Sequence, residues 1–151
     1  MTTTAAPSVD PRVIGLAHYA GRAVLEHVLG RHGATFQQQI TLRLVVTAET
    51  PLERDALAAQ VTASLKIPET EVLAVVDGLI GQGLAAAEGT AVRATDAGRK
   101  LYATVSAETG PISARIYAGI PAEDLAVAGR VLTVITERAD AELAALEATR
   151  K

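Results

Sequence analysis

Apolar residues recur at helical spacing over most of this chain. One stripe in the first such segment consists of Val13, Ala17, Ala20, Val24 and Val28. Asp10 and Pro11 stand directly before this stripe. That pair is typical of a helix start, because Asp accepts hydrogen bonds from free backbone N–H groups and Pro suits the first turn. The pattern therefore predicts a first helix over about 11–30.

Three further helical patterns follow, each with a start or stop signal. Thr35 to Gln38 has the form of a capping box before the second helix, whose apolar side is Ile40, Leu42, Val45 and Val46. Thr50-Pro51 restarts the chain into a third helix, and Pro68 begins a fourth that ends at Gly81-Gln82-Gly83. The predicted core of this part consists of Ile40, Leu57, Val61, Leu65, Val72, Val76 and Leu79.

The pattern changes to that of a β-hairpin between Leu84 and Thr95. Gly89 lies in the expected turn, where it can adopt the positive φ that a tight turn requires. Thr95-Asp96 then caps a fifth helix, expected to run to about Ala118. A last helix follows Pro121, with Glu123 and Asp124 in its first turn, where acidic groups favour the helix dipole.

The last helix carries a long apolar seam. Its members are Leu125, Ala128, Leu132, Ile135, Ala139, Leu143 and Leu146. Steps of three and four residues place them on one face. Such a face packs either on the core of its own domain or on a second subunit, and a seam of this length at a chain end favours a homodimer.

Composition narrows the class of protein. Of 151 residues, 49% are hydrophobic but only 3% aromatic, which suits packed helices, and the absence of cysteine excludes disulfides and thiolate metal sites. The apolar runs are too short for a membrane span, and residues 1–10 read as a flexible tail without a secretion signal. We therefore expect a cytoplasmic protein. Its net charge of −3 gives no electrostatic indication of nucleic-acid binding for the chain as a whole.

Several motifs occur in the order of one known family. Residues 61–72 fit a helix-turn-helix without a gap, and Val76-Asp77-Gly78-Leu79 followed by Gly83-Leu84 fits the end of its second helix. Thr95-Asp96-Ala97-Gly98 leading to Leu101 fits the "T-x-x-G-x-x-L" opening of a fifth helix. Matches also include Thr35, Gln38, Leu42 and Val45 in the second helix and Pro121-Ala122-Glu123 at the start of the last. With these motifs the chain, over about residues 11–148, resembles the multiple-antibiotic-resistance regulator (MarR) family.

The resemblance implies a mainly α fold with a small β-hairpin wing, in which a winged helix-turn-helix is flanked by long dimerisation helices. One domain would span residues 11–151, with the DNA-binding lobe at 35–95 and the dimerisation helices at 11–32 and 96–151. It further implies a homodimeric transcription regulator of double-stranded DNA that responds to a small ligand. The fourth helix would enter the major groove and the wing the minor groove. Candidate DNA contacts are Lys66, Thr70, Glu71, Ala74, Arg93 and Arg99.

The expected DNA-binding surface departs from the family pattern in its charge. Between Val61 and Leu84 the only cation is Lys66, whereas three residues are acidic: Glu69, Glu71 and Asp77. The Asp-x-Arg motif of the family's wing is absent, and Arg93 is the only basic residue of the hairpin. Because phosphate contacts need cations, two hypotheses stay open. One is a regulator with weak or unusual DNA contacts, and the other is a dimer that has lost DNA binding and holds a small molecule or protein partner.

Candidate ligand residues lie on the first two helices. His18, Tyr19 and Arg22 share one side of the first helix, and Arg43 stands on the second, so that they could hold a small aromatic or anionic ligand as the resemblance suggests. The plainer alternative is a set of surface side chains. The spacing of His18, His27 and His32 does not form a zinc pattern, and we expect no metal and no cofactor. Neither a catalytic triad nor a phosphate-binding glycine loop is present, so an enzyme has little support.

Overall fold

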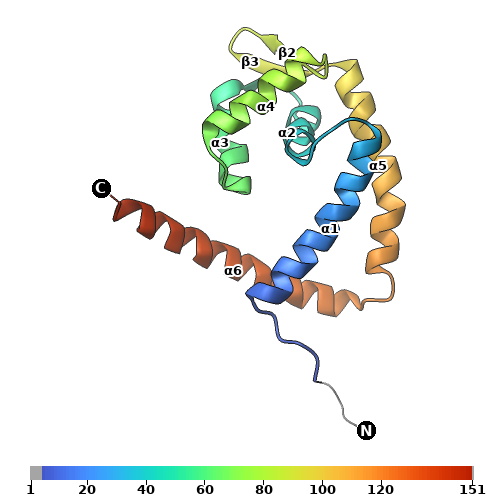
Figure 1. Ribbon diagram of the computed structural model, residues 1–151, viewed down its shortest axis with the longest axis vertical. Helices are drawn as coiled ribbons and strands as arrows, with labels where there is room; N and C mark the ends of the chain where they lie inside the picture. Colours follow the sequence, from blue (N-terminus) through green and yellow to red (C-terminus); the bar gives the residue numbers. More distant parts are fainter. Residues whose placement is uncertain (1–4, 151) are drawn as a thin grey trace. The chain divides into compact units, whose positions relative to one another are not determined.

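The computed structural model describes residues 5–150, which form a mainly helical protein with one small sheet (Figure 1). The helices are α1 (Pro11–Arg31), α2 (Phe36–Thr47), α3 (Arg54–Leu65), α4 (Glu69–Gly81), α5 (Asp96–Tyr117) and α6 (Ala122–Ala148). The strands are β1 (Leu52–Glu53), β2 (Ala85–Glu88) and β3 (Ala91–Ala94). This order of elements is that of a winged helix, so the predicted fold class is confirmed.

Two of the predicted helix starts form their expected hydrogen bonds. The carboxylate of Asp10 accepts from the backbone N–H of Val13 at 2.8 Å, with Pro11 in the first turn of α1. The hydroxyl of Thr35 accepts from the N–H of Gln38 at 3.2 Å, and the Gln38 side chain accepts from the N–H of Thr35 at 3.1 Å. The capping box of α2 is therefore confirmed. It fixes the entry of α2, which Figure 1 shows between α4 and α5.

The sheet has three antiparallel strands in the order β1-β3-β2. Strands β2 and β3 form the predicted hairpin, in which Gly89 has a φ of 61° at the turn. Strand β1 was not predicted: Thr50-Pro51 leads into this short strand, where Leu52 pairs with Val92, and α3 begins only at Arg54. A strand of two residues has no periodicity that a sequence pattern could reveal. Its pairing ties the start of α3 to the wing.

A cluster of buried aliphatic side chains packs α2, α3 and α4 against the sheet, and these elements together form the lobe. The members of the cluster are Leu42, Val45, Leu57, Ala58, Val61, Val72, Val76, Leu79, Ala85, Val92 and Ala94. Five of the seven predicted core residues belong to it. Leu65 is only partly buried against this cluster, and Ile40 is partly buried outside it, so the expectation of a central position was wrong for both. On α2 the fully buried position next to Leu42 is the polar Thr41, whose hydroxyl donates to the carbonyl of Gln37.

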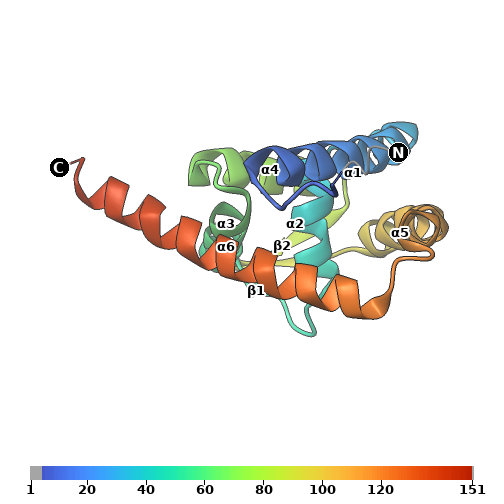
Figure 2. The same cartoon turned by 90° about the horizontal axis from the view of Figure 1, so that it is seen from below.

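The chain divides at Pro111, inside α5, into two compact units. In the second unit α6 is a single long helix (Figure 2), and none of its described residues is buried. Glu123 and Asp124 stand in its first turn, as predicted. The single domain over 11–151 stays a prediction. Residues 1–4 of the predicted tail and Lys151 lie outside the described residues, whereas residues 5–10 have no regular secondary structure. Among the described helices, none is long and apolar enough to cross a membrane.

Candidate nucleic-acid interface and ligand cavity

Helix α4 presents one packed face and one free face. Val72, Val76 and Leu79 are fully buried in the lobe, which fixes the rotation of the helix. Thr70, Ala74 and Asp77, spaced at four and three residues, are exposed and therefore form a ridge on the free face. The predicted contacts Thr70 and Ala74 belong to this ridge, and Glu71 is exposed beside it. Such a ridge on a rigid lobe has the form of a recognition helix.

The charged groups around this ridge are acidic or already engaged. Glu69 and Glu71 stand in the first turn of α4, where the helix dipole favours them. Asp77 accepts from Arg54 of α3 at 2.8 Å, so this pair is neutral within the lobe. Lys66 ends α3 with a positive φ of 57°, and its ammonium group turns back to the carbonyl of Ala63. The outer side of α4 itself therefore carries carboxylates and no cation among residues 69–81.

The basic side chains of the wing region are Arg93 and Arg99. Arg93 alternates with the buried Val92 and Ala94 on β3, so it points outward, and it lies 3.6 Å from the carboxylate of Glu88. Arg99, in the first turn of α5, donates to the carbonyl of Ala94 at 3.1 Å. Both predicted residues are thus at the wing, whereas Lys66 directly follows α3 and Thr70, Glu71 and Ala74 lie on α4.

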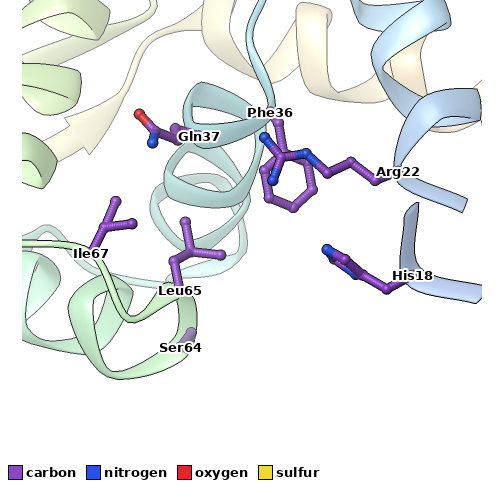
Figure 3. A pocket seen from close by; sticks show the side chains of 7 residues that line it. All are labelled: His18, Arg22, Phe36, Gln37, Ser64, Leu65 and Ile67. Carbon is purple, nitrogen blue, oxygen red and sulfur yellow. The ribbon is translucent and has the colours of Figure 1, made fainter. Parts of the chain in front are cut away.

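A cavity of about 220 Å³ lies between α1, the start of α2 and the end of α3 (Figure 3). It is lined by His18, Arg22, Phe36, Gln37, Ser64, Leu65 and Ile67. The guanidinium group of Arg22 stands 4.2 Å above the centre of the Phe36 ring and bonds Glu26 at 3.1 Å. One wall therefore offers an aromatic ring and a cation, while Leu65 and Ile67 supply an apolar wall, a combination that suits an aromatic or anionic molecule.

The cavity brings together two of the four predicted ligand residues, His18 and Arg22. Tyr19 is 69% exposed and contacts the His18 ring edge-on, and neither it nor the exposed Arg43 is among the lining residues. Sequence reasoning missed Phe36, although it is the only phenylalanine of the chain and directly follows the N-cap of α2. Among residues 5–150 no group of His, Asp or Glu side chains could hold a metal ion.

Comparison with known proteins connects this geometry with a fold family. No protein-family model matches the sequence, and no curated protein matches it. Solved structures do match. A protein assigned to the MarR family of transcriptional regulators from Listeria monocytogenes, complexed with 26mer DNA, has a TM-score of 0.74 at 16% identity, over 96% of this chain and 98% of that one.

Two further solved structures give the same picture. CouR from Rhodococcus jostii RHA1, bound to p-coumaroyl-CoA, has a TM-score of 0.69 at 18% identity, over 82% of this chain and 88% of its own. A MarR-family transcriptional regulator from Rhodococcus sp. RHA1 has a TM-score of 0.69 at 18% identity, over 82% of this chain and 91% of its own. Two of these three neighbours are described as transcriptional regulators of the MarR family. The chain therefore has the winged-helix fold of the MarR family of transcriptional regulators.

Proposed function

We propose that this protein is a cytoplasmic, homodimeric transcriptional regulator without enzymatic activity, which binds double-stranded DNA through α4 and the wing. The observation that carries the proposal is the exposed Thr70–Ala74–Asp77 ridge of α4 beside a two-stranded wing. The fold neighbour with a TM-score of 0.74 carries 26mer DNA, which supports the same use of this fold here.

The proposed contacts divide into base and phosphate contacts. Thr70 and Glu71 would face base edges, where Glu71 could accept from a cytosine amino group, and Ala74 would offer an apolar contact. Arg93, Arg99 and Lys66 would neutralise phosphates. Arg93 must leave Glu88 for this purpose, but their separation of 3.6 Å and side-chain exposures of 50% and 60% describe a weak surface pair. Breaking the Arg93–Glu88 pair is therefore no obstacle to DNA binding.

Fluorescence anisotropy with labelled DNA from upstream of its own gene, at several salt concentrations, tests the proposal. We expect the logarithm of the affinity to fall linearly with the logarithm of the salt concentration. Arg93→Ala should flatten that slope by about 1.8, since a dimer loses two phosphate contacts at roughly 0.9 each. Arg12→Ala, at the exposed start of α1, is the matched loss of one positive charge and should leave the slope unchanged.

The proposed homodimer rests on α6. Its large apolar residues are all at least 37% exposed: Leu125, Val127, Val131, Leu132, Val134, Ile135, Leu143 and Leu146. At about 100° per residue they cover roughly half of the helix circumference, wider than the predicted seam. A helix that is apolar over such an arc is stable in water only when another surface covers it.

Sedimentation equilibrium tests the dimer. Leu132→Asp would place an unpaired carboxylate in the seam of each subunit, so we expect the dissociation constant to rise by at least about a hundredfold. Thr133→Asp adds the same charge on the polar side of α6 and should leave it nearly unchanged. Parent protein at monomer mass in dilute buffer would contradict the homodimer directly.

The proposed ligand is a small aromatic or anionic molecule in the cavity of His18, Arg22 and Phe36. CouR was solved with p-coumaroyl-CoA, which supports an aromatic acid derivative as a first probe. Tyr19 and Arg43 would take part only if they turn toward the cavity. We expect p-coumarate to raise the melting temperature of the parent, and Arg22→Ala to abolish that rise because the carboxylate loses its cation. An unchanged melting temperature of the parent would remove support for this ligand class.

One observation favours a second function. The outer side of α4 carries Glu69 and Glu71 without an opposing cation in the helix, and Asp77 is already paired with Arg54. This surface suits a dimer that has lost DNA binding and now holds a small molecule or protein partner. The salt titration separates the two functions. Absence of binding at low salt, to the upstream DNA and to a random duplex alike, would refute the regulator and favour this alternative.

A further inference from the structure

A second cavity, of about 250 Å³, lies at the root of the wing. Three segments form it: the end of α2 with the following loop, the hairpin, and the first turn of α5, which directly follows the hairpin in Figure 1. Its apolar lining residues are Val45, Ala48, Pro51 and Ala94, of which Pro51 is exposed and Ala48 partly buried. Its volume is below the roughly 300–1,000 Å³ of sites for drug-sized ligands, so it suits a smaller molecule.

Two arginines are among the residues that line this cavity, Arg93 and Arg99. Arg99 donates one bond to the carbonyl of Ala94 at 3.1 Å and lies 3.9 Å from a carboxylate oxygen of Asp96, which is longer than a hydrogen bond. A guanidinium group has five N–H donors in a rigid plane. The bond to Ala94 therefore orients Arg99 while leaving most of its donors available for a carboxylate.

Two carboxylates line the same cavity, those of Glu49 and Glu88. Glu88 lies 3.6 Å from Arg93, beyond hydrogen-bond distance. Glu49 has no hydrogen-bond or ion-pair partner within residues 5–150. The lining thus carries two positive and two negative groups, of which only Arg93 and Glu88 form an ion pair, a weak one between exposed side chains.

We propose that the wing-root cavity binds an amino acid in its zwitterionic form, with a short aliphatic side chain. The carboxylate would lie against Arg93 and Arg99, the ammonium group against Glu49 and Glu88, and the side chain against Ala48 and Pro51. A simple anion would leave both glutamates unpaired beside it, and a simple cation would leave both arginines unpaired. A zwitterion satisfies all four charged groups, and charge-assisted hydrogen bonds of this kind are the stronger ones.

This inference gives the proposed regulator a means of control and, in that respect, rests on the proposed function. Arg93 and Arg99 are the cations that the wing region would use on phosphates. An amino acid bound between them would occupy both guanidinium groups, so ligand and DNA would compete. Bound amino acid would then lower the affinity for DNA without any change in the shape of the lobe.

Saturation-transfer NMR on the full chain tests the site without DNA. The probes are leucine, 4-methylpentanoate, which lacks the ammonium group, and 3-methylbutan-1-amine, which lacks the carboxylate. We expect leucine to bind at millimolar concentration or below, and each of the other two at least about tenfold more weakly, since each lacks one of the two charged groups that form charge-assisted hydrogen bonds. Equal binding of 4-methylpentanoate and leucine would overturn the zwitterion, and no saturation transfer to leucine would overturn the site.

Three variants locate the probe. Arg99→Gln should weaken leucine and 4-methylpentanoate alike, whereas Glu49→Gln should weaken leucine alone, because only leucine has an ammonium group. Lys100→Gln, next to Arg99 and outside the cavity, should change neither. Far-UV circular dichroism checks that each variant is folded. Loss of leucine binding in Arg22→Gln but not in Arg99→Gln would place the probe in the other cavity and overturn the proposal. Since no DNA is present, failure of DNA binding leaves this result independent.

Discussion

Gly98 stands in the first turn of α5, where that helix passes close to the backbone leading into β2. A Cβ atom at this position would lie 3.0 Å from the carbonyl carbon of Leu84, closer still to its oxygen, and 3.3 Å from Cδ1 of Leu42. That oxygen accepts a hydrogen bond from the N–H of Thr95, so the carbonyl is held in place. The perturbation that tests this packing is Gly98→Ala.

Two effects of opposite sign decide the result. In a helix with open space, Gly→Ala stabilises the fold by about 0.4–1 kcal/mol, because the unfolded chain loses freedom. At Gly98 the added methyl group meets backbone rather than a side-chain end that could rotate away. Overpacking of this kind costs about 1–3 kcal/mol, and the upper part of that range applies here. We therefore expect Gly98→Ala to lower the free energy of unfolding by about 1–2 kcal/mol.

Urea unfolding followed by circular dichroism measures this change, at one fixed protein concentration because a dimer's stability depends on it. The matched control is Gly30→Ala: Gly30 also lies in a helix, and a Cβ there meets nothing within 4 Å. The control should be as stable as the parent or more so. If Gly98→Ala proved as stable as Gly30→Ala, the close approach of α5 to Leu84 would be refuted.

Three local predictions follow from the lobe and the wing. Leu79→Asp puts a carboxylate at a position that is 1% exposed, so the free energy of unfolding should fall by about 4 kcal/mol or more and cooperative melting should be lost. The volume-conserving Leu79→Met should lower the free energy of unfolding by less than about 1.5 kcal/mol, and parent-like melting of the aspartate variant would contradict the burial. Thr35→Ala should lower the free energy of unfolding in urea by about 1 kcal/mol and Thr35→Ser by much less, because serine keeps the hydroxyl that completes the capping box. Equal losses of stability in the two variants would exclude the cap as the cause. Gly89 has a φ of 61°, so Gly89→Val should lower the free energy of unfolding in urea by about 1–2 kcal/mol and Gly89→Asn by less, since asparagine tolerates that conformation. A valine variant as stable as the parent would refute the turn.

The site could be predicted only in part. The exposed face of α4 followed from helical spacing, because Val72, Val76 and Leu79 had to be buried and Thr70 and Ala74 therefore faced outward. The cavity of α1 could not be predicted, since it joins His18 to residues about twenty and fifty positions away on α2 and α3. The ion pair of Arg54 with Asp77 could not be predicted either, for the same reason. Contacts between distant segments leave no local pattern.

The amino-acid sequence by itself determined the helix starts, the hairpin turn and the order of a winged helix. Asp10, Thr35 and Gly89 form a cap or a turn with residues a few positions away, so such signals can be recognised from the sequence without knowledge of the fold. Tertiary structure alone decided what depends on pairing across the chain. It placed Leu52 beside Val92 as a strand, and it brought Gly98 against Leu84. It also gathered two arginines and two glutamates around one cavity at the wing. The physical reason is range: capping and turn chemistry is local, whereas packing and charge compensation are fixed only when distant segments meet.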